Sequence, residues 1–418
     1  MDIEIRSVAA DEMKAYVRVL SAAFGETFPD EQLDDEMKTF ELDRSIAAFD
    51  AGRIVGTGGA YSMELTLPGA ASRAAGGLAT VPVGGLTAIA VLPTHRRRGI
   101  LRAMIMRHFE DVESRGEPVS VLFASESVIY GRFGYGVATL QAWYDIDPRR
   151  AAFDRAPAPA GRTRLVEGEE AARLLPEVYD RRRRLQAGEL SRSPARWEVD
   201  LRDAEWTRRP NTTGRFDVVY ESEPGQADGY ATYRVESRWA KGLTKSTVHV
   251  GELVALTNEA AAGLYRYCLD LDLVGTVQLE RRPVDEPLRW LLADPRRMRI
   301  SEVSDGLWVR LLDLPAALAA RRYTVPGSVV LQVTDRLRPA NDGRLLLEGG
   351  PDGADCRPTG REPDLVCDIA DLGAAYLGGT RLASLARAGR VHEQVPGALA
   401  RADAMLATEP EPWCTTTF

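Results

Sequence analysis

The feature that most constrains this chain is an apolar strand that runs directly into a basic turn and a helix. Residues 86–91 are Leu-Thr-Ala-Ile-Ala-Val, a run that is typical of a buried strand. Pro93, three arginines and Gly99 interrupt the run, and the helical spacing of apolar residues begins at Ile100. The segment therefore predicts a strand, a tight turn and a helix in immediate succession.

The turn has the chemistry of an anion site. The first backbone N–H groups of a helix have no partner inside the helix, and the helix dipole places partial positive charge there. Arg96, Arg97 and Arg98 add planar guanidinium groups that suit phosphate oxygens, and Gly99 has no side chain to keep a phosphate from the backbone. The sequence thus predicts a site for a diphosphate carrier. The alternative is an arginine cluster on a solvated helix start.

A tyrosine follows the next strand. Residues 100–115 predict the helix and residues 119–124 a buried strand, and Tyr130 lies within the aromatic and glycine-rich run 125–136. Open α/β sheets build their sites just beyond such strand ends. A phenol, with an ordinary pKa near 10, can give a proton to a leaving group and recover it afterwards. The alternative is a packed ring whose hydroxyl binds the backbone.

These motifs resemble those of a known enzyme superfamily. Arg96-x-x-Gly99-x-Leu101 resembles the Q/R-x-x-G-x-G/A loop of the GCN5-related N-acetyltransferases (GNAT), although Leu101 stands where that loop usually has Gly or Ala. Longer segments, together with a C-terminal Phe418, resemble the Eis (enhanced intracellular survival) branch of that superfamily. The segments that carry this likeness are residues 95–99, 124–126 and 129–136, and more weakly 228–235, 305–311 and 372–379.

The resemblance implies an acetyl-CoA site and direct acetyl transfer to an amine. In the family, the strand before the loop splays from its neighbour and hydrogen-bonds the pantetheine arm. Carried over to this chain, Tyr130 protonates the coenzyme A sulfur, the terminal carboxylate of Phe418 accepts the amine proton, and the N–H of Ile89 or Val91 faces the oxyanion. The residues implied to bind acetyl-CoA are Ile89, Ala90, Val91, Arg96, Arg97, Arg98, Gly99, Ile100, Leu101 and Ser125.

The end of the chain has its own chemistry. An α-carboxylate has an ordinary pKa near 3.5, so at neutral pH it is ionised and can accept a proton. Chain ends usually fray, but an aromatic last residue could anchor in a pocket and Trp413 could pin its approach. Cys414 is the competing nucleophile, and it has no His or Asp at a diagnostic spacing.

The early part of the chain offers contacts for an amine substrate. Phe24-Gly-Glu26-Thr-Phe28 resembles the family segment that supplies an acidic contact to an aminosugar, so Glu26 and Phe24, together with Trp413, are the candidate substrate-binding residues. The alternative for Glu26 is a solvated surface charge. A further acidic run over residues 30–36 could attract polyamines by long-range field, and it is more often only a solvated helix face.

Composition limits the class of protein. A chain of 418 residues with 44% hydrophobic and 27% charged residues suggests two to four ordinary globular domains. A net charge of −8 argues against general nucleic-acid binding and is compatible with polycationic substrates. The four cysteines and four histidines form no metal-ligand spacing, so we expect reduced thiols and no metal. We expect a cytoplasmic protein without a signal segment or membrane contact, because no charged apolar leader and no long apolar run occurs.

The order of predicted elements divides the chain into an α+β arrangement of tandem GNAT-like domains and a sterol-carrier-like C-terminal domain. Residues 1–147 predict the catalytic GNAT domain, which opens with β-α-β-β order. Residues 148–162, rich in Ala, Pro and Arg, predict a linker, and residues 163–303 a second GNAT-like domain without the phosphate loop. An unrelated α+β domain is the alternative there. Residues 304–418 resemble the sterol-carrier lobe, to which we assign a structural role rather than lipid carriage.

The function expected from sequence is acetyl-CoA-dependent N-acetylation of primary amines on a polycationic small molecule, with aminoglycosides as the substrates that the resemblance implies. The family also implies a homo-oligomer, a hexamer. Two other readings stay open. One is an acetyltransferase that acts on a protein lysine or a small-metabolite amine, and the other is a non-catalytic module that binds acyl-CoA or lipid.

Overall fold

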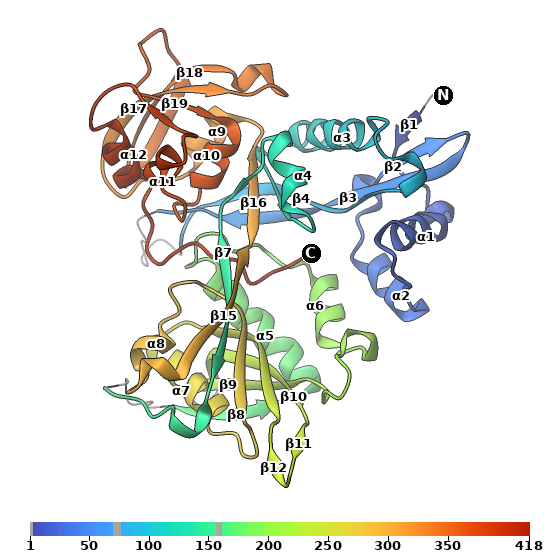
Figure 1. Ribbon diagram of the computed structural model, residues 1–418, viewed down its shortest axis with the longest axis vertical. Helices are drawn as coiled ribbons and strands as arrows, with labels where there is room; N and C mark the ends of the chain where they lie inside the picture. Colours follow the sequence, from blue (N-terminus) through green and yellow to red (C-terminus); the bar gives the residue numbers. More distant parts are fainter. Residues whose placement is uncertain (1–2, 70–76, 156, 158–160) are drawn as a thin grey trace. The chain divides into compact units, whose positions relative to one another are not determined.

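The computed structural model describes residues 3–69, 77–155, 157 and 161–418 (Figure 1). The chain forms two compact units. The first contains Met1–Thr139, Gln186–Ser193 and Asp305–Phe418, and the second contains Leu140–Leu185 and Pro194–Ser304. Throughout the described ranges, no helix combines the length and the apolar character needed to cross a bilayer.

The first unit is built on a mixed sheet whose strands lie in the order β1-β2-β3-β4-β5-β16-β6. Antiparallel pairs join β1 through β4, whereas β4 and β5 are parallel and are connected by a helix. The strands are β1 (Ile3–Arg6), β2 (Ile46–Asp50), β3 (Arg53–Thr66), β4 (Thr80–Val91), β5 (Val119–Phe123), β16 (Leu307–Leu311) and β6 (Gly136–Val137). The β-α-β-β opening expected from sequence is confirmed.

Helices cover both faces of this sheet (Figure 1). On one face lies α3 (Ile100–Ser114), whose buried residues recur every three or four positions and pack on the strands. The other face carries α1 (Met13–Phe24) and α2 (Asp30–Thr39); the hydroxyl of Tyr16 on α1 donates to the carbonyl oxygen of Gly58 on β3 at 2.8 Å. A short helix, α4 (Ser127–Tyr130), follows β5.

The C-terminal part of the chain belongs to the same unit and shares its core. Its sheet has the order β19-β18-β17-β20-β21, and its apolar residues form one cluster with Val83 and Val121 of the first sheet. The strands are β17 (Gly327–Thr334), β18 (Gly343–Gly350), β19 (Gly353–Pro358), β20 (Leu365–Asp368) and β21 (His392–Glu393). The helices are α9 (Leu314–Ala320), α10 (Ile369–Ala375), α11 (Leu382–Arg387) and α12 (Ala398–Leu406).

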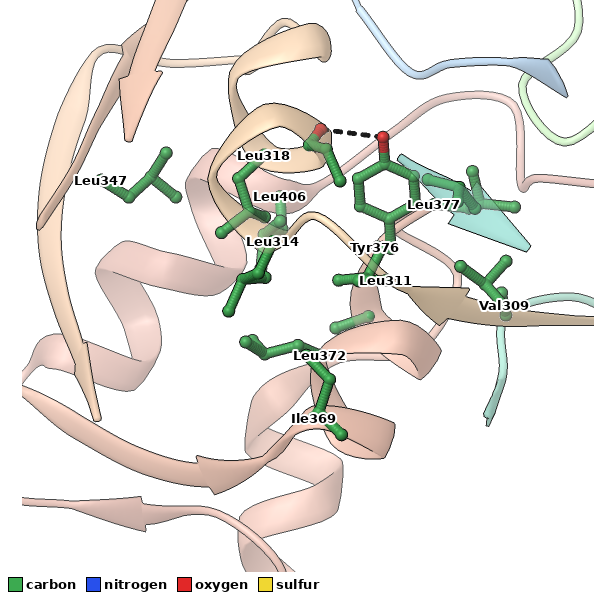
Figure 2. Packing of buried hydrophobic residues seen from close by; sticks show 14 of the residues in the cluster. Val309, Leu311, Leu314, Leu318, Leu347, Ile369, Leu372, Tyr376, Leu377 and Leu406 are labelled. Atoms are coloured by element: carbon green, nitrogen blue, oxygen red, sulfur yellow. Dashed lines mark hydrogen bonds between the residues drawn. The ribbon is translucent and has the colours of Figure 1, made fainter. Parts of the chain in front are cut away.

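Buried apolar side chains pack together in the interior of this lobe (Figure 2). Leucines from the sheet and from α9, α10 and α12 pack around Tyr376, whose hydroxyl donates to the carbonyl oxygen of Ala317 at 2.8 Å. The space left between Leu318, Leu347 and Leu372 measures ≈ 10 Å³. Such a space holds about one water molecule, far less than a lipid chain needs.

Two strands leave the domains in which the sequence placed them. We expected Leu307–Leu311 inside the C-terminal domain, but β16 pairs with β5 and β6 and completes the first sheet. We expected residues 140–147 in the first domain, but β7 (Leu140–Ile146) pairs with β14 of the second sheet. Both strands carry ordinary apolar strand patterns, and a local pattern does not specify the partner of a strand.

The second unit repeats the mixed architecture. Its sheet has the order β15-β7-β14-β13-β10-β9-β8, and β13 and β14 are its parallel pair. Its further strands are β8 (Arg162–Val166), β9 (Phe216–Glu223), β10 (Gln226–Glu236), β11 (Trp239–Ala240), β12 (Leu243–Thr244), β13 (Thr247–Ala255), β14 (Thr276–Arg282) and β15 (Met298–Asp305). Its helices are α5 (Gly168–Arg183), α6 (Pro194–Leu201), α7 (Asn258–Leu269) and α8 (Leu288–Leu291).

The helix after β13 begins almost at once. Strand β13 ends at Ala255 and α7 starts at Asn258, capped by Thr257, whose hydroxyl accepts a hydrogen bond from the N–H of Ala260 at 3.1 Å. The expected cap is therefore confirmed. A connection this short has no room for an arginine and glycine loop like that of the first unit.

The described residues of the predicted linker form local structure. A 3₁₀ turn occupies Pro148–Arg150, Phe153 forms an isolated bridge with Leu292, and β8 begins at Arg162. Residues 156 and 158–160 of the predicted linker lie outside the described residues.

Candidate active site

Strands β4 and β5 form a fork in the middle of the first sheet. They pair only from Val83 to Gly85 on β4, opposite Val119 to Val121 on β5. Beyond Gly85, β4 continues to Val91 along β3, and no described strand pairs with its other edge. The backbone groups of residues 86–91 on that edge therefore face the space between the strands, as the splayed strand of the resembling family implies.

A bulge fixes the diverging part of β4. Ala88 has a positive φ of 53°, and the pairing of β3 with β4 shifts register between Thr57 and Gly59. The Thr57 hydroxyl donates to the carbonyl oxygen of Ala88 at 2.9 Å. Bulges re-aim the backbone and are common beside active sites. Here the bulge turns residues 89–91 relative to the paired part of the strand.

The basic turn opens toward this part of β4. Arg97 and Gly99 both have left-handed backbone angles, with φ of 62° and 80°, which bring the chain sharply into α3 at Ile100. No atom lies within 4 Å of the place where a Cβ on Gly99 would stand, so the first N–H groups of α3 can be approached by a ligand. This is the anion-binding geometry that the sequence predicts.

A cavity of ≈ 740 Å³ lies between the basic turn, the end of β4 and α4. It brings together most of the residues expected from sequence: Phe24, Ile89, Ala90, Val91, Arg96, Arg97, Gly99, Ile100, Leu101, Ser125 and Tyr130. Eight further residues line it that were not among the expected site residues: Ala23, His95, Arg102, Glu126, Val128, Ile129, Arg132 and Phe133. Arg102 could have been found, because it lies one helical turn after Gly99.

Four expected residues do not line the cavity, and one of them, Phe418, is described below. Arg98 binds the carboxylate of Asp50 at 3.2 Å, at the end of β2, and does not line the cavity. Glu26 is exposed in the turn after α1, where its backbone N–H donates to the carbonyl oxygen of Ser21. Trp413 is buried in the tail, with its backbone N–H donating to the carbonyl oxygen of Ala187 at 3.0 Å. Trp413 is therefore held in the buried tail and does not line the cavity.

Tyr130 reaches the cavity from the end of α4. Its ring meets the ring of Tyr135 edge to face, with centroids 6.0 Å apart, and packs with Leu86 and Phe109 on the α3 side of the sheet. Burial and then the nearby charge of Glu126 raise the pKa of Tyr130, and a hydrogen bond with Ser125 opposes them. The phenol is therefore protonated at neutral pH and can act as an acid.

A buried polar chain holds the neighbouring ring. The Tyr135 hydroxyl lies 2.7 Å from the Ser120 hydroxyl, which lies 2.7 Å from Nε2 of His108. Burial lowers the pKa of His108 to about 3, so the imidazole stays neutral near neutral pH. Tyr135 is thus fixed on β5 and α3, and it supports the ring of Tyr130.

Phe418 lies at the branch point of the fork. A Cβ on Gly85 would stand only 3.0 Å from the Phe418 ring, so any side chain there would push the ring away by a few tenths of an ångström. The ring centroid is 5.5 Å from that of Phe123 on β5 and 6.0 Å from that of Tyr61 on β3. Phe418 packs with the cluster that contains Val83 and Val121, whereas Tyr130 packs in the α3 cluster. The two predicted catalytic residues therefore flank the fork from different faces of the sheet.

Cys414 is a poor nucleophile in this setting. Its thiol is buried and donates to the carbonyl oxygen of Thr416 at 3.3 Å. Burial, together with the nearby charge of Glu189, raises the pKa of the Cys414 thiol well above its ordinary value. Within the described residues, no cluster of three or more His, Cys, Asp and Glu side chains could hold a metal ion.

Comparison with known proteins agrees with this architecture. Residues 4–138 match a family model described as an acetyltransferase (GNAT) domain, residues 188–311 match another of the same description, and residues 314–415 match a sterol carrier protein domain. The expected order of tandem GNAT domains and a sterol-carrier-like domain is therefore confirmed. The alternative of an unrelated second domain is excluded.

Relatives cover nearly the whole chain. An uncharacterized N-acetyltransferase of Streptomyces avermitilis is 36% identical over 423 residues, which cover 100% of this chain and 99% of the relative. The N-acetyltransferase Eis of Mycobacterium tuberculosis is 36% identical over 364 residues, 85% of this chain and 84% of the relative. The crystal structure of Eis1 from Mycobacterium abscessus matches with a TM-score of 0.87 at 36% identity, covering 99% of this chain and 100% of that one.

Proposed function

Since this chain belongs to the Eis family of GNAT N-acetyltransferases, we propose that it transfers the acetyl group of acetyl-CoA to primary amines of a polycationic small molecule, with aminoglycosides as the first candidates. The observation that carries the proposal is the fork between β4 and β5, with the cavity and Tyr130 on one side and Phe418 at its branch point. A lipid-carrying role has no such support, because the space between Leu318, Leu347 and Leu372 is about the size of one water molecule.

The cavity suits coenzyme A in size and charge. Its ≈ 740 Å³ lies within the range of cofactor sites, which is about 300 to 1,000 Å³. Arg96, Arg97 and the open N–H groups after Gly99 would hold the pyrophosphate. The unpaired edge of Ile89–Val91 would hydrogen-bond the pantetheine arm, and Arg102 and Arg132 add positive charge to the same wall.

The reaction uses two groups of the protein as acid and base. The Phe418 carboxylate accepts a proton from the attacking ammonium, directly or through a water, and the freed nitrogen bonds to the thioester carbonyl carbon. Backbone N–H groups of Ile89 or Val91 stabilise the oxyanion. As the carbon–sulfur bond breaks, Tyr130 donates its proton to the sulfur, and the nitrogen gives up its second proton as the amide forms. That proton restores the Tyr130 phenol through water, the Phe418 carboxyl releases its proton to solvent, and no acyl-enzyme forms.

The proposed substrate class is supported by the negative charge of the protein and by an exposed aromatic residue at the edge of the cavity. The chain carries a net charge of −8, and α2 presents several carboxylates on the face of the first sheet where Phe418 lies. Such a field favours the approach of a polycation. Phe24 at the rim of the cavity offers an exposed apolar surface.

A product-mass assay tests the function. Purified chain ending at Phe418 is incubated with acetyl-CoA and one of three amines: an aminoglycoside, a linear polyamine or a lysine-containing peptide. We expect the aminoglycoside to gain acetyl groups with release of free thiol. If only the peptide or only the polyamine is acetylated, aminoglycosides are not the substrates, and the acetylated amine defines the substrate class instead. Coenzyme A binding without turnover on any amine would show a non-catalytic module.

The arginines of the basic turn should contribute unequally to cofactor affinity. Arg96→Ala is expected to raise the Kd of coenzyme A about tenfold, because charge-assisted hydrogen bonds contribute about 1.5 to 3 kcal/mol each. Arg98→Ala is the matched control and should change the Kd by about threefold or less, because Asp50 already neutralises Arg98. Titration by fluorescence measures both. Pantetheine, which has no phosphate, should bind all three proteins alike, and an equal loss in both variants with coenzyme A would contradict the assignment.

A further inference from the structure

The last residues of the chain are held by a short segment from its middle, Gln186–Ser193. We propose that this segment is a tail clamp in which Glu189 and Arg192 are positioning residues for the C-terminal carboxylate. The inference rests on the proposed function, in which that carboxylate accepts the amine proton. Residues 188–193 of the clamp lie within the second GNAT match, which has no phosphate loop between β13 and α7. The inference therefore assigns a role in the chemistry to the first residues of that match.

The tail clamp is itself fixed to the first sheet. Strand β2 pairs with β3 only as far as Gly58, and the clamp continues the pairing along the later part of β3. Leu190 forms an antiparallel bridge with Leu65. On either side of this bridge, the N–H of Thr66 donates to the carbonyl oxygen of Glu189 at 2.9 Å, and the N–H of Ser191 donates to the carbonyl oxygen of Glu64 at 2.9 Å. The clamp is therefore hydrogen-bonded along the strand that carries Tyr61.

Hydrogen bonds then run from the tail clamp to the tail. Gln186 donates to the carbonyl oxygen of Glu411 at 2.9 Å, and the N–H of Trp413 donates to that of Ala187 at 3.0 Å. One carboxylate oxygen of Glu189 accepts from the N–H of Thr415 at 3.0 Å, and the other accepts from the Thr415 hydroxyl. Arg192 donates to the hydroxyl of Thr416 at 2.8 Å. These contacts reach to within two residues of Phe418.

The burial of Glu189 suggests that its carboxylate holds the C-terminal tail in place. Its exposed fraction is 2%, and a buried carboxylate is costly unless hydrogen bonds compensate it. Both of its oxygens accept hydrogen bonds from Thr415, so the tail contributes directly to this compensation. Chain ends fray unless they are tied down. With Thr415 and Thr416 held by the clamp and the ring of Phe418 seated at Gly85, the terminal carboxylate is left little freedom.

Kinetics of Glu189 variants test the clamp. Glu189→Ala should lower kcat about 100-fold, because a displacement of about 1 Å at a reacting group can cost that much. Glu189→Gln keeps an oxygen for the N–H of Thr415 and should lose less, about tenfold. The Kd of coenzyme A should stay unchanged in both, since neither the clamp nor the tail lines the cofactor cavity.

Glu117→Gln is the matched control for loss of a buried carboxylate. Glu117 is buried in the same unit and binds both terminal nitrogens of Arg44, at 2.8 and 2.7 Å, without touching the tail. This variant should lower the melting temperature while leaving kcat within about twofold of wild type. If it lowers kcat as much as Glu189→Gln does, the Glu189 effect is one of stability and the clamp proposal is wrong.

Release of Phe418 by carboxypeptidase A measures the position of the tail without reference to activity. We expect the folded Glu189→Ala protein to release Phe418 at least about tenfold faster than wild type, because the cleavage rate follows the population of the detached tail. An unchanged release rate would overturn the clamp.

A double variant separates this inference from the proposed function. If Glu189 acts only through the tail, Glu189→Ala should cost no further rate in a chain that lacks Phe418. A loss of rate on removing Phe418, with none in Glu189→Ala, overturns the clamp alone. If removing Phe418 costs no rate, the terminal carboxylate is not the base and the proposed function loses that assignment. Faster release of Phe418 in Glu189→Ala would then show that the clamp orders the tail but has no role in catalysis, which overturns the positioning role.

Discussion

Replacing Tyr130 by phenylalanine is expected to lower kcat for amine acetylation by about 10²- to 10⁴-fold, the usual contribution of a general acid. The ring should keep its place, because it packs edge to face on Tyr135 and against Leu86 and Phe109, and these contacts do not involve the hydroxyl. The thiolate would then leave without a proton donor. Free-thiol release in steady state measures the rate, and the Kd of coenzyme A should stay within about twofold, since one neutral hydroxyl contributes little to binding.

The same residue sets an expectation for pH. A general acid works only while it is protonated, and burial raises the pKa of Tyr130 above the ordinary value near 10. Deprotonation of Tyr130 should therefore not lower the rate of the wild type until the pH exceeds 10. An alkaline decline near pH 8 that disappears in Tyr130→Phe would contradict this direction.

Tyr376→Phe is the control for removal of a buried tyrosine hydroxyl. The Tyr376 hydroxyl donates to Ala317 inside the C-terminal lobe, within the filled core of Figure 2. This variant should have an unfolding free energy about 1 kcal/mol lower than that of the wild type, and its kcat should be unchanged. If Tyr130→Phe retains more than half of the wild-type rate while Tyr376→Phe behaves as expected, Tyr130 is not the acid.

Local sequence signals were enough for the part of the site that lies between residues 86 and 136. An apolar run, a glycine with a left-handed backbone and a helix with buried residues every three or four positions are all encoded by neighbouring residues. The resemblance added the fork and the pairing of Tyr130 with Phe418. The cavity accordingly contains nearly every residue expected to bind the cofactor.

Interactions between distant parts of the chain could not be predicted in this way. Arg98 looked equivalent to Arg96 and Arg97, but Asp50, 48 residues earlier, binds it at the end of β2. The expected roles of Glu26 and Trp413 depended on where a turn and a tail would lie, which no local pattern fixes. The contact of Glu189 with Thr415 spans 226 residues, and nothing in the sequence around Glu189 marks it.

The unexpected sheet partners of β16 and β7 also result from interactions between distant parts of the chain. Leu307–Leu311 is buried at all five positions, and a continuous buried run of this kind suits the interior of either sheet. Its place beside β5 follows from the packing of the whole first unit. The consequence for the site is direct, because β16 supports the outer side of the strand that ends at Phe123, against which Phe418 packs.

Extending the chain beyond Phe418 is expected to abolish most of the activity, with a loss of about 10²- to 10⁴-fold in kcat, because the base disappears while the ring remains. In a chain extended by Gly-Ser, residue 418 carries a neutral amide in place of the carboxylate. The new carboxylate lies up to about 7 Å farther along the chain. Deleting Phe418 leaves a carboxylate on Thr417, displaced by about 3.5 Å and without the ring that packs at Gly85.

Phe418→Leu distinguishes the carboxylate from the ring. It keeps the terminal carboxylate at the same position in the chain and reduces only the packing against Gly85, Phe123 and Tyr61, so it should lose much less rate than the extended chain. All three variants should bind coenzyme A as the wild type does, because Phe418 does not line the cofactor cavity. An extended chain that acetylates amines at the full rate would show that a group other than the terminal carboxylate takes the proton. An equal loss in the extended chain and in Phe418→Leu would show that the ring, rather than the charge, is what the reaction needs from the end of the chain.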